Sequence, residues 1–217
     1  MDERNLQKRL LLAIVVNIAV MALEVWVMVS DFKVLGWKIF SYYTELSNLL
    51  AFVTCGLGAV YSVIALMKKD YIIPEFVKIL KFVAASLLTV VFFVVLFILT
   101  PHEVANGASL FSLVSGTMLF THIVIPLLVV ADFIFLAPAE RLEFPVTFLP
   151  MIATILYAVV IFLLCGLNVI EAPYFFLDIR NNPTYLSILY IVGITAFIYL
   201  ASFFLRKLDS HFGPCIH

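Results

Sequence analysis

The sequence has few charged residues. They make up 12% of its 217 residues, whereas soluble domains carry about 25%. With a net formal charge of −1 and no basic tract, nothing in it indicates nucleic-acid binding. Hydrophobic residues instead make up 65%, and the mean hydropathy is +1.16. This composition excludes an ordinary soluble domain and predicts a polytopic membrane protein.

Cysteine is also scarce, and Cys55, Cys165 and Cys215 stand far apart in the chain. None has a partner at metal-ligand or redox-motif spacing, so we expect no metal and no other cofactor. The basic start of the chain resembles the beginning of a secretory signal. The apolar run after it continues to about Ser30 without a cleavage pattern of small residues, so we expect a retained first helix.

Long apolar runs are abundant, and about 20 residues suffice for each crossing of a bilayer. We therefore predict an all-α protein, a bundle of six transmembrane helices in one domain, residues 1–217, with short polar connections. The expected spans are residues 10–30, 41–66, 76–100, 109–136, 146–167 and 184–205. We expect an integral membrane protein, which lies in the cell membrane if the chain is bacterial and in an endomembrane or the plasma membrane if it is eukaryotic.

The fourth expected span contains His122, and an ionisable side chain at such depth is a functional candidate by default. Pro126, four residues later, has no N–H to donate to the His122 carbonyl, so we expect a kink there. His122 could equally form an interhelical hydrogen bond that only stabilises the bundle. Asp132 is too far along the helix to orient the imidazole, and we interpret it as marking the cytoplasmic helix end.

The second expected span opens with FSYYTELSNLL, in which Thr44 and Asn48 project from one face and Ser47 lies beside them. Thr44 is a candidate nucleophile, because a neighbouring imidazole with an ordinary pKa of about 6.5 could take its proton. Asn48 is a candidate oxyanion donor. The alternative is a polar helix entrance whose hydroxyls bond their own backbone.

Two acidic residues could orient His122. Glu24 shares one face of the first span with Asn17, and Asp178 lies in the last outer loop. The residues alone do not choose between them, and Glu24 could also be a protonated or paired carboxyl near the interface.

Three segments, FSYYTELSNLL, THIVIPLLVVADFIF and APYFFLDI, resemble a bacterial family of predicted six-transmembrane proteins. That family is distantly similar to the eukaryotic androgen-induced and FAR-17a-like membrane proteins. The resemblance implies a hydrolase of fatty acid esters of hydroxy fatty acids, or of similar acyl esters, with Thr44 as nucleophile and His122 as base. The segment TELSNLL follows the bacterial group, whose activity the resemblance does not define.

Two functions therefore remain open. One is an intramembrane lipid esterase acting on a fatty-acyl ester, and the other is a noncatalytic lipid-binding or transport protein with a polar pocket at His122. Either would need an elongated, mostly apolar cavity. The expected span boundaries place Thr44 about 5 Å and His122 about 20 Å below the outer surface at 1.5 Å per residue, which is too far apart for proton transfer. The two depths agree only if residues 32–41 dip into the outer leaflet, so that the second helix starts deep, or if the fourth helix begins well above Ser109.

The lysine and arginine residues predict the orientation of the bundle. Ten fall on one side and three on the other, which places both termini in the cytoplasm. The ten are Arg4, Lys8, Arg9, Lys68, Lys69, Lys78, Lys81, Arg141, Arg206 and Lys207, and the three are Lys33, Lys38 and Arg180. Cysteine accessibility scanning should label a cysteine at Lys33 or Arg180 from outside and one at Arg4 only from inside. Outside labelling at Arg4 would reverse this topology.

Overall fold

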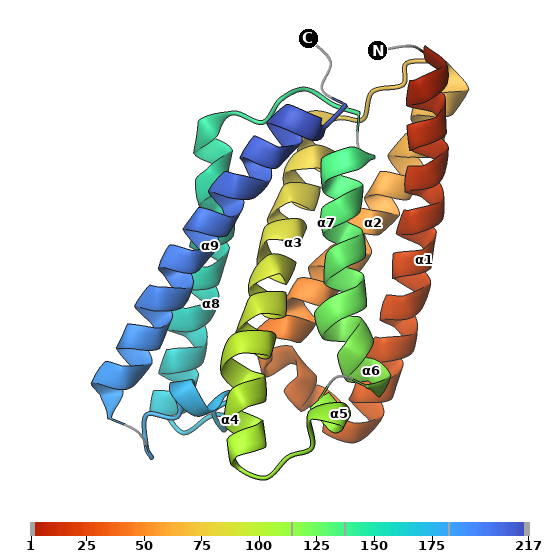
Figure 1. The fold of residues 1–217 in the computed structure, drawn as a ribbon. Coiled ribbons are helices and arrows are strands. Elements are labelled where there is room, and N and C mark those ends of the chain that lie inside the picture. The colour runs from red at the N-terminus through yellow and green to blue at the C-terminus, as the bar shows by residue number, and fades with distance from the viewer. Residues whose placement is uncertain (1–2, 114, 137, 182, 215–217) are drawn as a thin grey trace.

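A computed structural model describes residues 3–113, 115–136, 138–181 and 183–214 of the chain. These residues are 84% helical, form no strand, and include six helices long and apolar enough to cross a membrane. The prediction of an all-α, six-span membrane protein is confirmed. The first helix starts and the last helix ends at the same end of the bundle (Figure 1).

The spans follow one another in chain order, and four of them contain a change of helix type. The first is α1 (Glu3–Leu35) with the 3-10 turn η1 (Gly36–Ser41), and the second is α2 (Tyr43–Lys68). The third joins α3 (Glu75–Val94), the π-turn η2 (Val95–Leu99) and α4 (Thr100–Ala105). The fourth joins α6 (Gly116–Leu119), the π-turn η3 (Phe120–Val124) and α7 (Ile125–Phe135). The fifth is η4 (Phe144–Phe148) with α8 (Leu149–Gly166), and the sixth is α9 (Thr184–Phe212). Two short helices, α5 (Leu110–Leu113) and η5 (Phe175–Leu177), lie in the connections.

The fourth span begins seven residues later than the sequence predicts. Ser115 is extended, and Gly116 has a φ of 59°, a left-handed conformation that favours glycine. This break separates α5 from the membrane helix. His122 therefore lies only six residues into its span, or about 9 Å at 1.5 Å per residue.

The second span begins inside the bundle. In Figure 1 the chain descends along α1, turns back through η1, and starts α2 above the lower end of α1. The dip that the sequence suggested between Phe32 and Ser41 is thus present. Together with the late start of the fourth span, it removes the expected conflict in depth between Thr44 and His122.

Helix α3 is the centre of the bundle and packs against α2, α7, α8 and α9 (Figure 1). Its buried face carries apolar side chains such as Phe82 and Leu88, and also two lysines, Lys78 and Lys81. Lys78 Nζ lies 3.0 Å from Asp209 Oδ2 of α9, and Lys81 pairs with Asp132 of α7.

The burial of these lysines in ion pairs was not predicted from the sequence. Lys78 and Lys81 were expected among the charges on the cytoplasmic side, and Asp132 was expected to mark a helix end. Asp132 does lie in the last turn of α7, but all three side chains are almost completely buried in ion pairs. A buried charge is tolerated when it is paired and hydrogen-bonded. Without the two lysines, the charge bias is eight against three.

Gly58 of α2 makes room for the Lys81 side chain. A Cβ at this position would overlap the end of that side chain and would approach Asn17 Oδ1 to 3.0 Å. Lys81 cannot swing away freely, because its ammonium group is bound to Asp132. The glycine is therefore required by close approach and not by its backbone conformation.

We expect Gly58→Ala to destabilise the bundle by about 1–3 kcal/mol, the usual cost of overpacking a well-packed core. The measurement is the thermal unfolding midpoint of the purified protein in detergent. Gly56→Ala is the matched control, because a Cβ there would meet only Met21 at ordinary contact distances of 3.5 and 3.7 Å. Equal midpoints for the two variants would contradict the packing argument.

Candidate functional site

A cavity of about 550 Å³, called the main cavity below, lies at the end of the bundle opposite to the chain ends. Its wall combines the last turns of α1, the start of α2, the η2 and α4 segment, η3 and the loop before η5. Thr44 and His122 both line it. The other lining residues are Asp31, Val34, Leu35, Tyr42, Glu45, Val95, Leu99, Thr100, Glu103, Thr117, Met118, Pro173, Tyr174 and Phe175.

Thr44 belongs to the first turn of α2, where backbone N–H groups have no partner within the helix. Its own N–H donates to the Tyr174 hydroxyl at 3.4 Å. Tyr42, the residue before the helix, is extended and lines the main cavity, so the chain enters α2 at the cavity wall. The Thr44 hydroxyl, the Tyr174 phenol and the positive end of the α2 helix dipole therefore lie together.

His122 lies in the π-turn η3, four residues before Pro126. Because proline lacks an N–H, the regular hydrogen-bond ladder cannot continue there. The Ile125 N–H instead bonds to the Phe120 carbonyl, five residues back. Turns of this type occur frequently at functional sites.

The tautomer of the His122 ring follows from its hydrogen bond. Nδ1 lies 2.9 Å from the Met118 carbonyl, which can only accept, so Nδ1 carries a proton. In the neutral ring Nε2 is then the basic nitrogen. Nε2 has no hydrogen-bond partner within the part of the chain that the structure describes, so it is available to act on a molecule in the cavity.

A second, narrow cavity of about 50 Å³ adjoins Thr44 and Tyr174 on the side of α3 and α9. Its wall is almost entirely apolar and includes Val94 and Ile194. These two residues also line an apolar groove of about 390 Å³ between η2 and α9. The groove and the narrow cavity therefore lie on either side of the same two apolar side chains.

The other expected site residues lie apart from this cavity wall. Asn48 is fully buried, and neither amide atom has a hydrogen-bond partner among the described residues. The Ser47 hydroxyl donates to the Tyr43 carbonyl at 2.7 Å, within its own helix. Neither residue lines the main cavity, so the structure offers Asn48 no position as an oxyanion donor there.

Neither acidic candidate contacts the His122 ring. Asp178 is held by Asn181, whose side chain donates to it at 2.7 Å, and this hydrogen bond lowers the pKa of Asp178. Glu24 is fully buried, and neither of its oxygens has a partner among the described residues. The orienting partner of the imidazole is the Met118 carbonyl, a backbone group that sequence reasoning did not identify.

Two residues of the site were missed at the sequence level. Tyr174 stands within the segment APYFFLDI, and Glu45 directly follows Thr44. Both line the main cavity. Tyr174 could have been noticed because it lies in APYFFLDI, one of the segments that carry the family resemblance. Nothing in the sequence paired it with Thr44.

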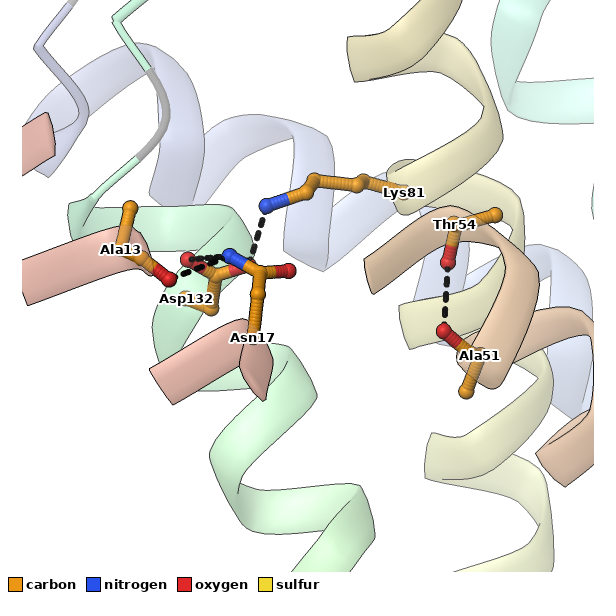
Figure 2. Close-up of polar contacts among 6 residues, drawn as sticks. All are labelled: Ala13, Asn17, Ala51, Thr54, Lys81 and Asp132. Carbon is orange, nitrogen blue, oxygen red and sulfur yellow. Dashed lines mark hydrogen bonds and ion pairs between the residues drawn. The ribbon is translucent and has the colours of Figure 1, made fainter. Parts of the chain in front are cut away.

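A second polar cluster lies nearer the chain ends (Figure 2). Asn17 of α1 donates to Asp132 at 3.3 Å and to the Ala13 carbonyl at 2.6 Å, and Lys81 binds the other oxygen of Asp132. The Thr54 hydroxyl bonds only the Ala51 carbonyl of its own helix and stays outside the cluster. No group of three or more His, Cys, Asp or Glu side chains suited to a metal ion occurs among the described residues.

Comparisons of the chain with protein-family models, with curated proteins and with solved structures found no match.

The hydrogen bond of His122 predicts a single neutral tautomer. At about pH 8, above the ordinary imidazole pKa of about 6.5, ¹⁵N spectra of histidine-labelled protein should show a ring protonated at Nδ1 and not at Nε2. His122→Ala identifies the signal by its loss, and the half-exposed His102 provides an internal comparison. A signal from His122 with the proton on Nε2 would contradict the assignment.

Proposed function

We propose that the protein is an intramembrane esterase that hydrolyses fatty-acyl esters, such as fatty acid esters of hydroxy fatty acids, with Thr44 as nucleophile and His122 as base. The observation that carries this proposal is that these two residues, from different spans, line one cavity. The resemblance of the sequence to membrane threonine hydrolases adds support for the same two positions.

The chemistry begins at the Thr44 hydroxyl. His122 Nε2 takes its proton as Oγ1 attacks the acyl carbon, and the resulting imidazolium returns that proton to the departing alcohol. Water then attacks the acyl-threonine, His122 accepts a proton from the water, and the Thr44 oxygen is protonated as it leaves. The products are an alcohol and a fatty acid.

The negative oxygen of the tetrahedral intermediate needs hydrogen-bond donors. The Tyr174 hydroxyl lies beside the Thr44 backbone and is one candidate. The first-turn amides of α2 are others, because they belong to the positive end of the helix dipole. These groups replace Asn48 in the proposed mechanism.

The shape of the site supports a lipid substrate. An acyl chain could lie in the apolar groove between η2 and α9 if Val94 and Ile194 move apart and join the groove to the narrow cavity beside Thr44. The main cavity has a more polar wall, which suits the other arm of an ester. The charge bias places both termini in the cytoplasm, so the proposed site belongs to the outer half of the membrane.

We expect Thr44→Ala and His122→Ala each to abolish hydrolysis of a long-chain acyl ester by the purified protein. The double variant should be hardly worse than either single one, because a nucleophile and its base act as a unit. Tyr174→Phe should lower kcat by roughly 10²–10³, the usual effect of removing one oxyanion donor.

A fluorophosphonate probe gives a second measurement that does not depend on the choice of ester. The wild-type protein should be labelled at Thr44, and Thr44→Ala should lose the label. Thr54→Ala is the matched control, because Thr54 is a buried threonine of the same helix that bonds its own backbone. Full hydrolysis by well-folded Thr44→Ala would refute the proposed mechanism and favour a noncatalytic lipid-binding protein.

A further inference from the structure

One face of α1 carries a line of polar residues. Asn17, Glu24 and Asp31 follow one another at intervals of seven residues, which places them on the same side of the helix. The first and the last of these residues each have a polar partner or a cavity beside them. Asn17 donates a hydrogen bond to Asp132 in the second polar cluster, and Asp31 lines the main cavity. Glu24, between them, does not have such a contact.

Glu24 is completely buried, with an exposed fraction of 0%. Both of its carboxyl oxygens lack a hydrogen-bond partner among the described residues. An ionised carboxylate without a partner is strongly disfavoured in a membrane interior, so such a group is retained only as a neutral acid or with a bound counter-ion.

The buried ionisable groups that share this part of the bundle do not include an unpaired cation among the described residues. On α2 the nearby groups are Glu45 and Cys55. On α3 and α7, Lys81 and Asp132 are paired with each other. On η3, the His122 ring donates to the Met118 carbonyl. A proton is therefore the counter-ion that fits this position.

Glu45 connects this position with the main cavity. It lines the cavity wall and is close enough to Glu24 for the two carboxyl groups to interact electrostatically. One of its oxygens, Oε2, is buried without a partner among the described residues. Asp31, on the same wall, interacts with Glu45 in turn.

We propose that the Glu24 carboxyl is a proton-binding site within the membrane and that it exchanges its proton with the main cavity through Glu45. In the exchange, an O–H bond of the Glu45 carboxylic acid breaks and the proton bonds to a Glu24 carboxylate oxygen, directly or through one water molecule. The reverse transfer returns it to the cavity. This site uses neither Thr44 nor His122, so it is independent of the proposed hydrolysis.

Infrared spectroscopy of the purified protein in lipid bilayers tests the proposal. At neutral pH the wild-type protein should show the C=O stretching band of a protonated carboxyl group, and ¹³C-labelled glutamate should shift that band. Glu24→Gln should remove it. Glu103→Gln is the matched control, because Glu103 is another carboxyl of the same cavity wall, and it should leave the band in place.

The route through Glu45 has its own measurement. Transfer of the wild-type protein to D₂O should shift the band as the proton exchanges, and Glu45→Gln should retain the band but slow this shift. Equal exchange rates would overturn the route. Loss of the band in Glu45→Gln, its absence from the wild-type protein, or its insensitivity to ¹³C-glutamate would overturn the site. The labelled wild-type spectrum and Glu45→Gln decide the matter even if Glu24→Gln does not fold.

Discussion

The buried ion pair between Lys81 and Asp132 is the contact on which the arrangement of the bundle depends. In hydrocarbon, neither charge can exchange its partner for water, so the two helices that carry them must meet at this point. Asn17 extends the contact to α1, and Gly58 lets α2 approach closely enough to cover it. Four helices are thereby fixed to one another near the end where the chain starts and finishes.

The opposite end of the bundle is built differently. There the third and fourth spans both contain a π-turn, η2 and η3, and both turns contribute to the wall of the main cavity. The first residues of α2 and α6 line the same cavity. Irregular backbone at membrane depth is tolerated only where protein or a cavity surrounds it. The polar cluster at one end thus joins the helices, and the irregular turns at the other end surround the main cavity.

Much of this fold could be predicted from the sequence, because apolar runs of about 20 residues have few alternatives in a membrane. The six spans were found, and so were Thr44 and His122 as polar residues at unusual positions. The seven-residue error at Gly116 arose because a glycine and a serine inside an apolar run change hydropathy little, although they interrupt the helix. The turn of η1 into the bundle was suspected only because two depth estimates disagreed.

The partners of polar residues were much harder to predict. Lys78 and Lys81 stand at the start of the third expected span, so they were counted with the charges at that membrane surface, and nothing in the sequence indicated that they pair in the core. Asp132 stands near the end of an apolar run and suggested an interface for the same reason. Pairing requires knowledge of which helix faces reach one another, and that depends on the packing around α3. Tyr174 and Thr44 likewise meet only because a loop between two spans folds back over the start of α2.

The π-turn at Phe120–Val124 also determines which way the rest of its helix faces. Such a turn contains more residues than an α-helical turn, so the side chains beyond it are rotated, by about 100° for one extra residue, relative to an uninterrupted helix. His122 lies within the turn and Asp132 lies ten residues later, yet both point into the bundle. In a regular α-helix, ten residues would set the two side chains about 80° apart. The extra residue makes this angle larger, because ten residues then turn like nine, or about 180°. A single span therefore presents its two buried polar side chains in different directions, His122 toward the main cavity and Asp132 toward Asn17 and Lys81.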